Sequence, residues 1–327
     1  MRRSGWIVLA FAAGCQGEDK GTETGQIVED TGSGDVDCVA TLLEIDLEDG
    51  AADVYYRRSF AAVFSEPATG PVSALLTGSD GVETEVSITL DETGFNAVLD
   101  PGPMTAEETY QLDLDVCGEL SSFGFTTSIY GGALIVDPGE LAGNAYLFDL
   151  GSAEYVQPEG IGMIIGLFLS APLIVGVTEA NESEITLLGS QGWIDDVTGD
   201  IFQSSGLATW EFGTADFSEQ PWFWTQSDMI NIDYDGYDIP VYDFAIQGTF
   251  EPDGSSIGGA SALGLADTRS MGPLLDLGDD PAAVCDYGAG FGLVCDPCPD
   301  DEPYCLTLEA LFEACDLIEG LTLEVIE

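Results

Sequence analysis

Short apolar runs recur along residues 38–128 and are separated by turn-forming residues. Many of them alternate apolar and polar positions, which is the pattern of a strand with one buried face. Several short strands in succession predict an antiparallel β-sandwich. The expected strands are Thr41–Leu47, Phe60–Phe64, Val72–Leu76, Val82–Leu90, Ala97–Leu99, Tyr110–Val116 and Gly124–Thr127.

Residues 129–327 predict a larger β-rich domain of the α+β class, with less regular spacing. Strands are expected at Ala145–Val156 and Ile185–Gly189. Asp-Gly pairs predict two hairpin turns. The first joins Met229–Tyr234 to Tyr237–Phe244 through Asp235-Gly236, and the second turns at Asp253-Gly254 after Ala245–Phe250. The chain as a whole is therefore expected to be mainly β.

One apolar stretch, Ile161–Val177, allows two interpretations. Gly162, Gly166 and Pro172 interrupt it, which disfavours insertion into a membrane. We expect a short buried helix after Pro158 that leads into a core strand from Leu173. The alternative is the wall of a pocket for a lipid or another apolar ligand.

The N-terminus has the features of an export signal. A short basic region is followed by the apolar run Trp6–Ala13, which is too short to span a bilayer. Ala12-Ala13-Gly14-Cys15 resembles the bacterial lipobox, although Ala12 stands where that family usually has Leu. The resemblance implies removal of residues 1–14 and lipidation of Cys15, and Gln16 implies delivery to the outer membrane; cleavage without lipidation is the alternative. Residues 15–37 are then a flexible acidic tether.

The first domain resembles a known family, the S-layer (SbsA-type) bacterial Ig-like domain. The segments that carry the resemblance, in order along the chain, are Glu48–Val54, Ala62–Pro67, Leu99–Met104, Thr109–Leu112 and Phe125–Thr127. Leu47 departs from the family, which commonly has Pro there, and Gly118-Glu119-Leu120 replaces a Gly-Asn turn. The resemblance implies an Ig-like Greek-key sandwich over residues 38–128 with a spacer or adhesive role.

Composition excludes several classes of function. The chain has 60 acidic residues, 6 basic residues and no histidine. A surface this anionic repels phosphate backbones, so we expect no nucleic-acid partner. Without histidine there is no Ser-His-Asp triad and no imidazole ligand for a metal. A mechanism that uses only carboxylates survives, but no pattern selects a pair of acids.

The cysteines predict an oxidising compartment. Cys38 and Cys117 bracket the first domain, and a bridge between them would staple its first and penultimate strands. The remaining cysteines after Cys15 form an odd-numbered cluster, so either one thiol is free or one pairs elsewhere; the cluster is Cys285, Cys295, Cys298, Cys305 and Cys315. We expect disulfides there, with a zinc site or a redox site at Cys295-Asp296-Pro297-Cys298 as alternatives.

Three further groups of residues are candidates for binding. Asp233, Asp235 and Asp238 resemble a calcium loop, but their glycine stands fourth instead of sixth, which favours a hairpin turn. Trp222 and Trp224 suggest a platform for stacking, or alternatively a strand that is half core and half rim. Arg269 is expected to make a structural ion pair, with recognition of an anionic ligand as the alternative.

These observations predict a non-catalytic lipoprotein of the bacterial cell envelope, in which the Ig-like module is a stalk or spacer for a C-terminal binding domain. We expect a lipid-mediated membrane contact, other envelope or surface components as partners, and no cofactor apart from calcium as an open possibility. A carrier of an apolar ligand is the first alternative. A carboxylate-based hydrolase is the second.

Overall fold

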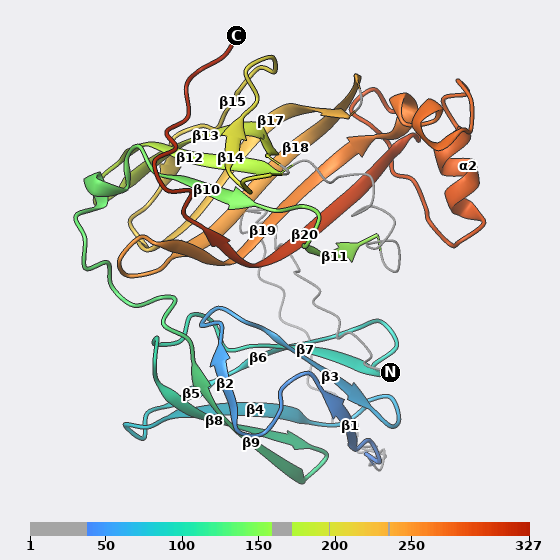
Figure 1. The fold of residues 1–327 in the computed structure, drawn as a ribbon. Helices are drawn as coiled ribbons and strands as arrows, with labels where there is room; N and C mark the ends of the chain where they lie inside the picture. The colour runs from blue at the N-terminus through green and yellow to red at the C-terminus, as the bar shows by residue number, and fades with distance from the viewer. Residues whose placement is uncertain (1–37, 159–171, 196, 235) are drawn as a thin grey trace, which may run out of the picture. The chain divides into compact units, whose positions relative to one another are not determined.

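A computed structural model describes residues 38–158, 172–195, 197–234 and 236–327 (Figure 1). This part of the chain divides into two compact units. Unit 1 comprises residues 38–104 and 108–126, and unit 2 comprises residues 105–107 together with the described chain from residue 127 onward.

Unit 1 is a sandwich of two antiparallel sheets. The first has the strand order β1-β3-β7-β6 and the second the order β2-β9-β8-β4-β5. The strands are β1 (Leu42–Ile45), β2 (Ala51–Val54), β3 (Phe60–Phe64), β4 (Val72–Gly78), β5 (Glu83–Glu85), β6 (Ser87–Leu90), β7 (Asn96–Asp100), β8 (Thr109–Val116) and β9 (Glu119–Thr127).

The core of unit 1 follows from the alternation in its strands. Phe60 and Phe64 lie on the same face of β3 and are buried. The ring of Phe60 packs against Phe125 of the other sheet, with 5.6 Å between centroids. Two details differ from the expected strands. β2 was not anticipated, and Val82–Leu90 is split into β5 and β6, one in each sheet. The split occurs at Val86, which is buried and bonds its N–H to Ala74.

Unit 2 also contains two antiparallel sheets. One has the order β10-β12-β13-β14, with β15 and β16 also paired to β13; the other has the order β11-β20-β19-β18-β17. Their strands are β10 (Ala145–Phe148), β11 (Glu154–Gln157), β12 (Leu173–Ala180), β13 (Glu184–Ile194), β14 (Ile201–Gln203), β15 (Trp210–Glu211), β16 (Ala215–Asp216), β17 (Trp222–Tyr234), β18 (Tyr237–Phe250), β19 (Ser256–Asp267) and β20 (Cys305–Asp316).

Short helices complete unit 2. They are the 3-10 turns η1 (Pro138–Leu141), η2 (Thr268–Ser270) and η3 (Pro273–Leu275) and the α-helix α2 (Ala283–Ala289). In the described chain, α2 lies in the segment that contains the clustered cysteines. No helix of the described residues is both long enough and apolar enough to cross a membrane.

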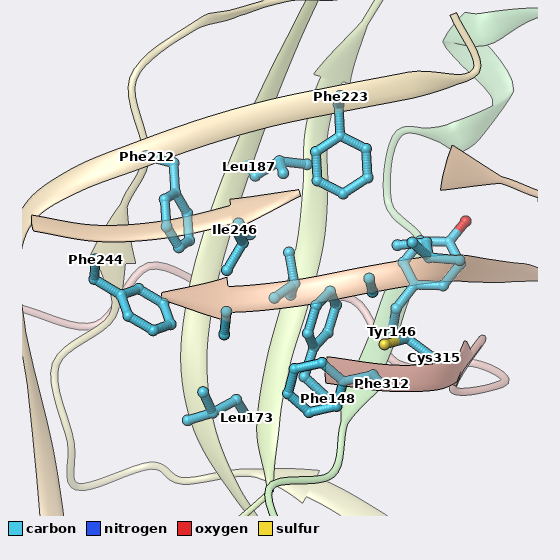
Figure 2. Packing of buried hydrophobic residues seen from close by; sticks show 14 of the residues in the cluster. Tyr146, Phe148, Leu173, Leu187, Phe212, Phe223, Phe244, Ile246, Phe312 and Cys315 are labelled. Atoms are coloured by element: carbon cyan, nitrogen blue, oxygen red, sulfur yellow. The ribbon is translucent and has the colours of Figure 1, made fainter. Parts of the chain in front are cut away.

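Side chains from both sheets fill the core of unit 2. Figure 2 shows Tyr146 and Phe148 of β10 beside Phe312 of β20, with Phe223, Phe244 and Ile246 contributed by β17 and β18. Phe148 and Phe312 pack edge to face at 5.1 Å between centroids. Apolar side chains that pack in this way exclude water and are the main favourable contribution to folding.

Several expectations for unit 2 change in detail. Ala145–Val156 is not one strand, because the chain leaves β10 and enters β11 of the other sheet. Residues 237–250 form one strand instead of two, with an irregularity at Asp243, whose φ is 49°. Residues 161–171 of the apolar stretch, and with them the short helix expected after Pro158, lie outside the described residues. Leu173, Val175 and Val177 are in β12 and belong to the core. The prediction of a mainly β chain with a disulfide-rich C-terminal segment is confirmed.

Candidate functional site

The described cysteines are arranged as three disulfides and one thiol. Cys38 is bonded to Cys117, the pair expected from the sequence, with 5.5 Å between their Cα atoms. In the C-terminal cluster the bridges are Cys285–Cys295 and Cys298–Cys305. Cys295 and Cys298 are therefore not bonded to each other, and the CxxC is neither a redox pair nor a source of two thiolates. Cys15 lies outside the described residues.

Cys315 is the free thiol of the described chain, and it is fully buried in the core cluster of unit 2. Burial and the neighbouring Asp316 carboxylate raise the pKa of this thiol. A buried thiol that stays protonated is a poor nucleophile and a poor metal ligand. Cys315 therefore acts as a small apolar side chain.

Arg269 is held by two carboxylates. Its guanidinium donates to both oxygens of Asp267, at 2.9 and 2.6 Å, and to Asp300 at 2.6 Å. Its planar group also lies 5.9 Å from the centroid of the Tyr304 ring. These contacts raise the pKa of Arg269 and hold the pKa of Asp300 below its usual value. The geometry is that of the structural ion pair, and it ties η2 to the Cys298–Cys305 loop.

Among the described residues, one group of side chains in the same region is close enough together to hold a metal ion. The potential ligand atoms of Asp267, Cys298 and Cys305 lie within 4.8 Å of one another. Both sulfurs, however, belong to one disulfide, and Asp267 is engaged by Arg269. Cysteine sulfur binds zinc as thiolate, which a disulfide does not supply, so these residues do not fit a zinc site.

The other two candidate groups lie on the β17–β18 hairpin. Asp233 and Asp238 are directly opposite each other in its register, as a hairpin requires, and Asp235 lies outside the described residues. Trp222 and Trp224 share one face of β17, while Phe223 between them is fully buried and Trp224 is 39 % exposed. This is the half-core, half-rim arrangement, and it leaves one indole accessible at the sheet surface.

A pocket of ≈ 450 Å³ lies along the free edge of β17. One wall is made by alternate residues of that strand, Met229, Asn231 and Asp233, and the other by the loop Gly206–Thr209 with β15. Glu211 and Asp238 add carboxylates at its rim. Because Asn231, Glu211 and Asp238 are exposed, the pocket opens to solvent.

A buried glutamine, Gln191, bonds to Asp233 in the wall of this pocket. Gln191 of β13 donates from its side-chain nitrogen to the Asp233 carbonyl at 2.7 Å and accepts from the Asp233 N–H at 3.0 Å. Nearer the start of β17, Thr225 donates to the carbonyl of Gly213 at 3.2 Å. The sequence did not predict this pocket. Its one available signal was a glutamine within the apolar run of β13.

Comparison with known proteins identifies no family and only distant structural similarity. The sequence matches no known protein family. No curated protein is similar to it either. Among solved structures, CopC from Methylosinus trichosporium OB3b is similar with 14% sequence identity, over 27% of this chain and 93% of that chain, at a TM-score of 0.21.

Two surface-layer structures are also similar. The S-layer protein rSbsC(31-844) has 11% identity, over 82% of this chain and 51% of that chain, at a TM-score of 0.19. Domains 1-6 of surface layer protein SbsC have 10% identity, over 83% and 50% of the two chains, at a TM-score of 0.20. This chain spans about half the length of these two structures. At such scores the likeness carries no argument.

Proposed function

We propose that the chain is a non-catalytic protein of the bacterial cell envelope, anchored by a lipid on Cys15, in which unit 1 is a spacer and unit 2 a binding domain. The observation that carries the proposal is the set of three disulfides, because such bonds persist in compartments outside the cytoplasm. The lipobox-like sequence before Cys15 and the resemblance of residues 38–128 to S-layer Ig-like domains support the same location.

The carboxylates support a non-catalytic role. Asp267 and Glu309 are the described acidic residues that are most buried, at 5% and 7% exposure. Asp267 is engaged by Arg269, whereas hydrolysis by two carboxylates needs both to face a substrate. The packed side chains of β10, β12 and β20 likewise support a structural core over a cavity for an apolar ligand.

The anchor is tested by metabolic labelling. In cells fed a radioactive fatty acid, we expect label on the wild type and on Cys315→Ala but not on Cys15→Ala. The wild type and Cys315→Ala should sediment with membranes, while Cys15→Ala should remain soluble, because acyl chains contribute about 0.8 kcal/mol of membrane affinity per buried CH₂.

A thiol count gives an independent check. Since Cys315 is buried, native lipidated protein should not react with iodoacetamide. Unfolding without reduction should expose one thiol in lipidated protein and two in protein that keeps an unmodified Cys15. In the labelling experiment, fatty-acid label retained by Cys15→Ala, or absent from the wild type, would contradict the lipid anchor.

A further inference from the structure

The free edge of β17 has backbone groups that face away from its sheet, and several of its residues line the pocket. β17 pairs with β18 alone, so it is the last strand of its sheet. The N–H and C=O of Asp233 bond to the Gln191 side chain, so both face away from β18. Because backbone direction in an antiparallel pair alternates with period two, the N–H and C=O of Asn231 face the same way. Pro240, opposite Asn231, has no N–H and is consistent with this alternation.

In the described part of the chain, these edge groups are only partly satisfied. The carbonyl of Met229 accepts from the Ser227 hydroxyl at 3.2 Å, and Asp233 is occupied by Gln191. Asn231 has no backbone hydrogen bond to any described residue. An edge with open donors and acceptors is a template for another strand.

The side chain of Gln191 shows how a partner would bond. Its amide supplies one donor and one acceptor to the backbone of a single β17 residue, which is what one residue of a neighbouring antiparallel strand supplies. The next residue of that edge with the same orientation is Asn231, in the pocket wall. Asn231 therefore offers the next outward-facing donor and acceptor of this edge.

The charge at the edge selects among partners. Asp228, Asp233 and Asp238 flank it on the hairpin, and Glu211 stands on the opposite wall. Unit 2 contains a single basic residue, Arg269, and that residue is already paired. A second copy of this chain would bring like charges together, whereas a cationic segment would be attracted.

We propose that the edge of β17 at Met229 and Asn231 binds an extended, positively charged polypeptide segment of another protein by strand addition. The incoming backbone bonds to Asn231, and its basic side chains lie near Glu211 and Asp238. The proposal rests on the proposed function in that it assigns a partner to the binding domain, but it does not depend on the lipid anchor.

The test measures peptide binding to the purified full chain with Cys15→Ala, which carries no lipid. The probe is a fluorescent octapeptide of alternating Lys and Val, compared by anisotropy with its Glu-Val counterpart. Two further peptides carry N-methyl groups on either the Lys or the Val backbone nitrogens. We expect saturable binding of the Lys-Val peptide, none of the Glu-Val peptide, and a loss of about tenfold or more for one methylated peptide only, since each removes the donors of one edge.

Variants of the chain give the matching result. Asn231→Pro removes the outward N–H without touching the β17–β18 ladder and should weaken binding about tenfold, whereas Asn231→Ala keeps that N–H and should change affinity by less than about threefold. Asp238→Asn should weaken binding and reduce its dependence on salt.

Three results would overturn the proposal: no saturable binding, equal binding of both methylated peptides and their parent, or self-association of the chain through this edge that Asn231→Pro abolishes. The methylated peptides decide the matter even if Asn231→Pro does not fold. None of these results would affect fatty-acid labelling of Cys15, so failure of the anchor and failure of the peptide site are distinguishable.

Discussion

Unit 1 closes its sandwich with a disulfide between positions 79 residues apart, whereas the two disulfides of unit 2 join positions 10 and 7 residues apart. Unit 2 draws side chains from most of its strands into one aromatic-rich core, and its short bridges fix only the segment around α2. The contrast indicates that a small sandwich depends on a long-range covalent link, while a larger one depends on burial.

Removing disulfides should give the largest difference between the units. In the chain-entropy estimate, loss of the Cys38–Cys117 link costs about 4.5 kcal/mol, and loss of Cys285–Cys295 about 2.7 kcal/mol. We expect Cys38→Ala/Cys117→Ala to unfold unit 1 well below the unfolding temperature of the wild type. Cys285→Ala/Cys295→Ala should mainly expose the α2 segment.

Hydrogen exchange resolved by region measures both effects in the full chain. The matched control is Cys315→Ala, which removes a buried sulfur without breaking a bridge. If exchange in unit 1 were unchanged without Cys38–Cys117, the proposed dependence of the small sandwich on its link would be wrong.

Sequence predicted the strands best where alternation was strict and turns were marked. β3 begins and ends where expected, since Phe60, Ala62 and Phe64 alternate with exposed or half-buried positions and Pro67 follows. Prediction failed where the chain changes sheets, as at Val86, because the two runs on either side are continuous in hydropathy. No periodicity marks such a crossover.

The candidate site was predictable only in part. The hairpin of Asp233 and Asp238 was visible because an Asp-Gly pair has a known turn geometry. The pocket beside it was not predicted, because its other wall comes from residues 206–211 and because Asp233 in its wall is held by Gln191 on a different sheet. Long-range contacts of this kind leave no local pattern.

Replacing one arginine in each unit, Arg269 and Arg58, gives a second test of the difference between the two units. Arg269→Gln leaves Asp267 buried and unpaired and releases Asp300, which should cost about 3 kcal/mol. Arg58→Gln in unit 1 should cost less. Arg58 bonds Asp46 at 3.1 Å, but its own Nε is buried without a hydrogen bond in the described structure, so the substitution also removes an unsatisfied donor.

The pH dependence of the arginine effect has a definite sign. Arg269 lowers the pKa of Asp300, so the stabilisation is present above the ordinary carboxyl value and is lost as pH falls through the lowered one. The difference in unfolding free energy between wild type and Arg269→Gln, from urea titrations, should narrow in acid. A difference that grew in acid would contradict the role of the ionised Asp300.

The smallest expected effect concerns Glu309, a buried carboxylate in unit 2 that lacks the arginine partner that Asp46 has in unit 1. Asp46 is offset by Arg58, although burial still raises its pKa. Glu309 lies opposite Leu263 and Gln157 in the sheet, and burial raises its pKa with no compensating cation among the residues that the structure describes. A raised carboxyl pKa favours the protonated form in the fold, so stability falls as pH rises through that pKa.

Glu309→Gln should therefore stabilise the chain at pH 7 by about 1 kcal/mol, the lower end of the penalty for an unpartnered buried polar group, and should have little effect near pH 4. Asp91→Asn in unit 1 is the control of opposite sign. The Asn96 amide and the Thr93 hydroxyl bond to Asp91 and hold its pKa at about 2, so its contribution is present at neutral pH and disappears as pH falls toward that value. If Glu309→Gln and Asp91→Asn shifted the unfolding temperature in the same direction at pH 7, the explanation would be wrong. Burial without a cation at Glu309, and hydrogen bonds at Asp91, would then not account for the opposite effects of the two carboxylates on stability.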